Sequence, residues 1–168
     1  MQAPMLGTVY YLSRYGATGD YARWLSADAG FDLKDIGKNP RIGSESVVVV
    51  GSSLMVGKVR AASWIRKNWG RMKGRKVVFF FVGASKIGSK EREDILTRSL
   101  PKEALDGAKV FHLPGRIDHS KLGWFTSRMF KSFAKYEKDE NERKRAVEGY
   151  DDVKKELLEP VVAYIKGL

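Results

Sequence analysis

The sequence predicts an α/β fold of three layers, in which helices cover both faces of a doubly wound, five-stranded parallel sheet with the strand order 2-1-3-4-5. Two observations lead to this prediction. Runs of apolar, mostly β-branched or aromatic residues recur along the chain without polar alternation, which is typical of parallel strands buried on both faces. Segments with helical periodicity separate these runs, and such alternation indicates a sheet covered on both sides.

The strands are the best-defined elements. Long apolar runs predict buried strands at residues 5–12, 46–51 and 75–82, and two shorter runs predict strands at residues 31–36 and 108–113. Because the carboxyl ends of parallel strands meet at one edge of the sheet, a ligand site is expected there.

Helical periodicity predicts the connections between the strands. The first helix covers residues 18–30, with Thr18 as its expected N-cap. Further helices are expected at residues 59–69 and 89–100. A closing helix is expected at residues 153–165, in which Pro160 predicts a kink or a break.

A basic, aromatic helical insertion at residues 116–148 interrupts this alternation after the last strand. Its apolar residues recur at helical spacing, which predicts a stripe packed against the core: Leu122, Phe125, Met129, Phe133 and Tyr136. The opposite side combines a tryptophan with cations: Trp124, Arg128, Lys131 and Lys135. That combination fits packing beneath an arginine, contact with a lipid or amphiphile, or stacking on a nucleobase, and the sequence leaves these alternatives open.

Composition narrows the classes of function. The 168 residues suit a single domain that spans residues 1–168, and the absence of cysteine excludes disulfides, thiolate metal sites and thiol catalysis. The longest apolar run is too short to cross a bilayer and the start lacks the features of a signal peptide, so we expect a cytoplasmic protein. The formal net charge of +11 favours anionic partners, and the insertion suggests the inner membrane face as a peripheral location.

Three loops at the expected site edge carry the candidate binding residues. The loop at residues 13–18 combines hydroxyls at Ser13 and Thr18 with a glycine and the start of a helix, a pattern that favours a phosphate. A capped turn that binds no ligand is the alternative interpretation. The other two loops are residues 52–58 and 83–87.

These stretches resemble flavodoxins. VYYLSRYGAT is similar to the strand and loop that hold the FMN phosphate in that family, and VVVVGSSLMVGK and VFFFVGAS are similar to its two loops beside the flavin ring. The resemblance covers residues 5–113 and the closing helix, and it implies FMN as the cofactor. The FMN-binding residues that it implies are Ser13, Arg14, Tyr15, Gly16, Ala17 and Thr18 at the phosphate; Ser52, Ser53, Leu54, Met55, Val56, Gly57, Lys58, Val82, Gly83, Ala84, Ser85 and Lys86 around the ring; and Gly115 and Arg116 closing the site.

Two stretches also resemble a narrower group, the bacterial quinone-dependent protoporphyrinogen dehydrogenases. They are GSSLMVGK and LPGRIDHSKLGWFTSRMFK, the second of which belongs to the insertion that ordinary flavodoxins lack. This resemblance implies an FMN-dependent oxidoreductase that moves electrons from a small organic substrate to a quinone or a protein acceptor. The sequence departs from many flavodoxins in offering no aromatic residue in the two ring loops.

Two other functions fit part of the pattern. A flavodoxin-type electron carrier would need a redox partner protein but no substrate of its own, although familiar flavodoxins are acidic. A flavin-free module for nucleic acid, the least favoured function, would use the eight basic residues between positions 58 and 76, which equally fit a solvated helix face. His112 is expected to be structural, His119 is a candidate for the substrate side, and no catalytic side chain or metal site is predicted.

Overall fold

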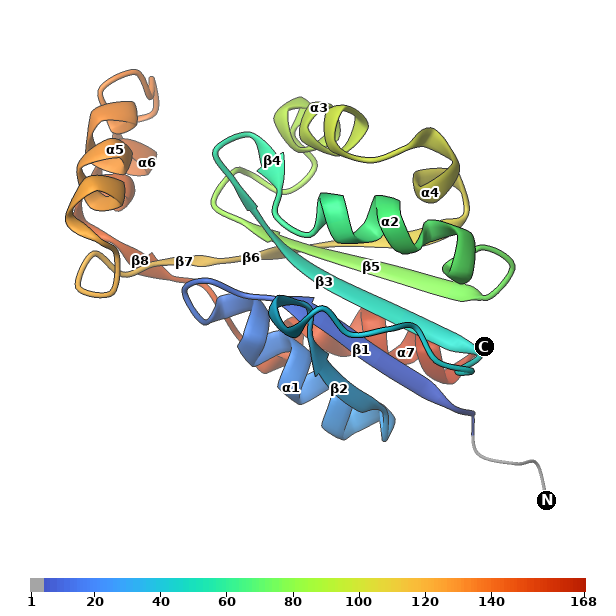
Figure 1. The fold of residues 1–168 in the computed structure, drawn as a ribbon. Helices are drawn as coiled ribbons and strands as arrows, with labels where there is room; N and C mark the ends of the chain where they lie inside the picture. The colour runs from blue at the N-terminus through green and yellow to red at the C-terminus, as the bar shows by residue number, and fades with distance from the viewer. Residues whose placement is uncertain (1–4) are drawn as a thin grey trace.

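A computed structural model describes residues 5–168 (Figure 1). The first four residues, which belong to the stretch judged to lack a signal peptide, lie outside the described range. Five parallel strands form the central sheet in the order β2-β1-β3-β5-β6, which confirms the predicted class and strand order. The strands are β1 (Gly7–Leu12), β2 (Asp32–Asp35), β3 (Val47–Met55), β5 (Lys76–Gly83) and β6 (Ala108–Pro114).

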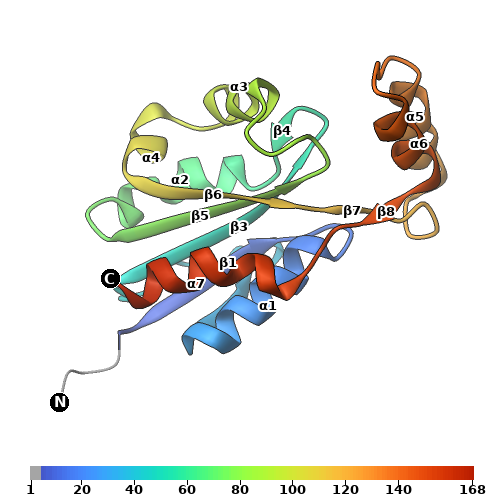
Figure 2. The same cartoon turned by 180° about the vertical axis from the view of Figure 1, so that it is seen from behind.

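The helices form two layers, one on each face of the sheet (Figures 1 and 2). One layer holds α2 (Ala62–Met72), α3 (Lys90–Ser99) and α4 (Lys102–Asp106), and the other holds α1 (Ala17–Ala29) and α7 (Glu159–Lys166). Successive strand residues point to opposite faces, so Val48 and Phe79 pack under the first layer while Val49 and Phe80 pack under the second.

Strand register aligns the carboxyl ends at one edge. Leu12 pairs with Ser52 across β1 and β3, and Ser53 pairs with Val82 across β3 and β5. Gly83 pairs with Pro114 at the end of β6. The segments that follow these strands therefore lie beside one another, as a binding edge requires.

Two connections at this edge differ from the prediction. Helix α1 begins at Ala17 with Gly16 as its N-cap, at a φ of 93° that suits glycine, so the assignment of Thr18 as the cap is wrong. The stretch at residues 52–58 is a β-hairpin rather than a loop, because β3 continues to Met55 and pairs with β4 (Lys58–Val59). Its turn residues, Val56 and Gly57, have φ values of 51° and 68°.

Helices α7 and α2 each show a feature that the sequence did not predict. Pro160 lies in the first turn of α7, where its missing N–H breaks no hydrogen bond, so it starts the helix after the 3-10 segment η2 (Lys155–Leu158) and does not kink it. Trp64 of α2, which lies close to basic residues in the sequence, is buried. Its ring lies 5.0 Å from that of Tyr10, and its Nε1 donates to the carbonyl of Pro40 at 3.3 Å.

The insertion forms a helical hairpin on a two-stranded ribbon. The ribbon pairs β7 (Arg116–Ile117) with β8 (Tyr150–Asp151), and the hairpin contains α5 (Trp124–Ala134) and α6 (Glu140–Glu148). Figures 1 and 2 show it standing beyond the end of the sheet. The prediction of a core-facing stripe is therefore wrong for Phe125 and Phe133 of α5 and for Tyr136 just beyond it. These side chains are exposed because α5 packs on α6 and not on the sheet.

Within residues 5–168, no helix combines the length and the apolar character needed to cross a membrane.

Candidate functional site

A pocket of about 540 Å³ lies where the carboxyl ends of the strands meet the hairpin. All three predicted loops contribute to its wall, as does the segment after β6. The predicted residues that line it are Ser13, Arg14, Tyr15, Ala17, Thr18, Ser53, Leu54, Met55, Val56, Gly57, Val82, Gly83, Ala84, Ser85, Gly115 and Arg116.

Four predicted residues do not line the pocket. Gly16 acts through its backbone as the N-cap of α1, and the Oγ of Ser52 points inward, where it accepts a hydrogen bond from the N–H of Ala61 at 2.9 Å. Lys58 and Lys86 are exposed on β4 and in the loop after β5. Neither lysine therefore places its charge in the wall of the site.

Seven lining residues were not among the predicted site residues: Glu91, Ile95, Ile117, Leu122, Met129, Phe130 and Phe133. Five of them, Ile117 and the last four, come from the insertion. The helical spacing of Leu122, Met129 and Phe133 was visible in the sequence, but it indicates only a shared helix face and not what that face meets. Phe130 and Phe133 supply aromatic rings to a pocket whose two ring loops contain none.

The start of α1 provides an anion cradle. No side chain caps this helix, so its first N–H groups are available and its dipole favours negative charge. The Oγ of Ser13 beside it is buried and has no hydrogen-bond partner within residues 5–168. A buried hydroxyl without a partner fits a site that is completed by a phosphate.

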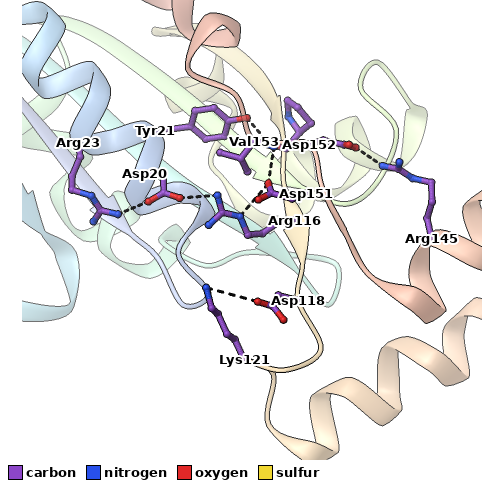
Figure 3. Close-up of polar contacts among 11 residues, drawn as sticks. Asp20, Tyr21, Arg23, Arg116, Asp118, Lys121, Arg145, Asp151, Asp152 and Val153 are labelled. Carbon is purple, nitrogen blue, oxygen red and sulfur yellow. Dashed lines mark hydrogen bonds and ion pairs between the residues drawn. The ribbon is translucent and has the colours of Figure 1, made fainter.

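Arg116 lies between two carboxylates (Figure 3). Its Nη2 is 2.7 Å from Oδ2 of Asp20 in α1, and its Nε donates to Oδ1 of Asp151 in β8 at 3.2 Å. Nearby, Tyr21 Oη donates to the carbonyl of Pro114 at 2.9 Å, and burial raises the pKa of Tyr21 to about 12. Arg116 thus joins the ribbon to α1, and its charge is largely balanced by these two carboxylates.

Arg92 of α3 is a buried cation behind the second ring loop. Its guanidinium donates to the carbonyls of Gly83 at 2.8 Å and Ser85 at 2.9 Å. It also reaches the carbonyls of Leu113 at 3.2 Å and Phe81 at 3.3 Å. Arg92 therefore clamps the ends of β5 and β6 and the loop that lines the pocket.

His112 of β6 accepts a hydrogen bond from the guanidinium of Arg92. Its Nδ1 lies 3.4 Å from Nη1 of Arg92, and burial, followed by the Arg92 charge, lowers the pKa of His112. The imidazole is thereby held neutral, which fits the structural role expected from the sequence.

His119 connects the parts of the insertion. Its Nε2 donates to the carbonyl of Ala146 in α6 at 2.9 Å, and its Nδ1 lies 2.7 Å from Ser127 Oγ in α5. His119 does not line the main pocket, and its predicted place on the substrate side stays a prediction.

Comparison with known families decides the family of the chain. The model of the flavodoxin domain matches residues 8–144. The chain belongs to the flavodoxin domain family. FMN is the cofactor of flavodoxins, which bind it at the edge where this pocket lies, and membership confirms FMN as the expected cofactor. The open first turn of α1 and the unpartnered hydroxyl of Ser13 fit its phosphate.

Solved structures similar to this chain include other flavoproteins. A WrbA-like flavodoxin from Agrobacterium tumefaciens is 18% identical, with a TM-score of 0.47, over 62% of this chain and 75% of that chain. A flavoprotein in complex with FMN from Lactobacillus acidophilus is 17% identical, with a TM-score of 0.43, over 64% and 91%. An archaeal flavodoxin is 11% identical, with a TM-score of 0.46, over 96% and 99%. A comparison with curated proteins finds no match.

Proposed function

We propose that this flavodoxin-domain protein is an FMN-dependent oxidoreductase that takes two electrons from an apolar organic substrate and delivers them to a quinone or a protein acceptor. The observation that carries the proposal is the second wall of the pocket. Met129, Phe130 and Phe133 of α5 close the side opposite the loops expected to hold the flavin. An electron carrier that acts only through its flavin edge needs no such wall.

The residues of the chain divide into two groups. Ser13 and the first turn of α1 would hold the phosphate, while Leu54, Met55 and the segment at residues 83–85 would frame the ring. When bound, FMN supplies two-electron redox chemistry, and the protein supplies binding, orientation and exclusion of water.

The α5 wall defines the substrate class. Apart from Arg116, which is paired with Asp20 and Asp151, the insertion contributes only apolar side chains to the pocket, so it favours a largely apolar molecule. In each step the substrate would lose two electrons and two protons, and a quinone acceptor would gain both to become a quinol; complete oxidation of a porphyrinogen to a porphyrin takes three such steps. The narrower sequence resemblance makes a reduced tetrapyrrole such as protoporphyrinogen the first substrate to test.

The test is anaerobic oxidation of protoporphyrinogen by the FMN-loaded protein with menadione as acceptor. Phe133→Ala removes part of the substrate wall and should raise KM roughly five- to thirtyfold, as expected for a loss of about 1–2 kcal/mol of apolar contact. FMN affinity should not change. Phe125→Ala, on the same helix but outside the pocket lining, is the matched control and should behave as the wild type.

A different outcome would assign the alternative function. If the wild type neither oxidises protoporphyrinogen nor reduces a quinone, yet exchanges electrons rapidly with a redox protein, the chain is an electron carrier. In that case Phe133→Ala should leave the exchange rate unchanged.

A further inference from the structure

Helix α5 and the turn that follows it, residues 124–136, present four large aromatic side chains to solvent. The exposed fractions are 72% for Trp124, 73% for Phe125, 59% for Phe133 and 83% for Tyr136. Single exposed apolar side chains are common on protein surfaces, but a group of four on one short segment marks a binding surface.

The charge on the same segment is of one sign. Residues 119–136 contain four basic residues and no acidic residue. Arg128, Lys131 and Lys135 form no ion pair within residues 5–168, and the guanidinium of Arg128 lies 5.3 Å from the centre of the Trp124 ring. The partner should therefore be anionic as well as apolar.

Helical spacing arranges these groups as two adjoining faces. Trp124, Arg128 and Lys135 share one side of α5, and Phe125, Met129 and Phe133 share the next. A helix that lies in a bilayer interface has this design, with aromatic side chains at the acyl boundary and cations that reach the lipid headgroups.

We propose that α5 docks the protein on an anionic lipid surface. The hairpin stands clear of the α/β body, so a flat membrane can approach it (Figures 1 and 2). Phe133 is both exposed and part of the pocket lining, so the pocket opens beside the docked surface and can receive an apolar molecule from the bilayer. The docking itself does not depend on the proposed function and is measurable without any redox substrate.

The experiment is flotation of the 168-residue protein with vesicles of phosphatidylcholine alone or mixed with phosphatidylglycerol. Binding should require the anionic lipid and should weaken as salt rises, because exposed charges are screened. Emission from Trp124 should shift to shorter wavelength on anionic vesicles, and Trp124→Ala should abolish the shift. Lys131→Glu with Lys135→Glu should lower the partition coefficient roughly tenfold or more, from the energy of each cation near an anionic leaflet.

A matched control separates the α5 surface from net charge. Lys67→Glu with Arg71→Glu makes the same change in charge at two exposed positions of α2 and should leave vesicle binding near the wild-type level. The proposal is overturned if this control loses as much binding as the α5 variant. Equal binding to neutral vesicles would also overturn it, as would absence of binding at low salt. Binding of a single-stranded oligonucleotide that depends on Lys131 and Lys135, without vesicle binding, would replace it with a nucleic-acid surface.

Discussion

Replacement of Arg92 by methionine tests whether one buried cation holds the second ring loop in place. Methionine keeps much of the side-chain volume but donates no hydrogen bond. The two shorter bonds of Arg92, to Gly83 and Ser85, are each worth roughly 1.5–3 kcal/mol because the donor is charged. Part of this gain offsets the desolvation of a cation that has no carboxylate partner within residues 5–168.

The expected loss in the free energy of unfolding for Arg92→Met is therefore about 3 kcal/mol. For a domain of this size that corresponds to a fall in Tm of roughly 6–12 °C. Urea denaturation and thermal melting of the apoprotein measure both quantities. FMN affinity, followed by quenching of flavin fluorescence, should also fall because the clamped loop lines the pocket.

Two companion variants control this experiment. Arg98→Met removes an exposed arginine from the same helix and should change the free energy of unfolding by less than about 0.5 kcal/mol. Arg92→Lys keeps the charge but cannot reach every carbonyl, so its stability should lie between wild type and Arg92→Met. An Arg92→Met protein within 1 kcal/mol of wild type, with unchanged FMN affinity, would refute the clamp.

Three further predictions follow from the site. Ser13→Ala should weaken the binding of FMN by roughly 1.5–3 kcal/mol and leave the affinity for riboflavin unchanged, because only FMN carries the phosphate. Equal losses of affinity for both ligands in fluorescence titrations would contradict this prediction. The lowered pKa of His112 means that the unfolded chain binds its proton more tightly, so stability should fall as the pH drops below about 6.5, and His112→Gln should flatten that slope in urea titrations at several pH values. Arg116→Met frees the ribbon from Asp20 and should cost about 1–2 kcal/mol and speed proteolysis of the hairpin; cleavage at the wild-type rate would show that other contacts hold it.

Local periodicity was sufficient for the body of the fold. Each buried strand is a short apolar run whose alternate residues face two helix layers, as Val48 and Val49 do, and that pattern is legible without tertiary information. The same pattern gives the positions of the strands in the sequence. It therefore predicts which loops bind a ligand, because the carboxyl ends of parallel strands share one edge. Ser13 and Gly83 line the pocket at that edge.

Helical periodicity does not show what a helix face packs against. The spacing of Phe125, Met129 and Phe133 states that they share a face, but it is the same for a face on the core, over a ligand or in solvent. Trp64 lies close to basic residues in the sequence, yet it is buried against Tyr10 from a strand distant in the chain.

Residue patterns alone predicted the strands, their shared binding edge and the anion-favouring loop, because the periodicity and the loop residues behind these predictions lie close together in the chain. The folded structure was needed to show that the insertion lies outside the core and that α5 supplies the aromatic wall of the pocket. It also decided that Arg116 is neutralised by Asp20 and Asp151 and that Arg92 spans the ends of two strands. These outcomes depend on contacts between residues far apart in the chain, and local patterns do not encode which distant groups will meet.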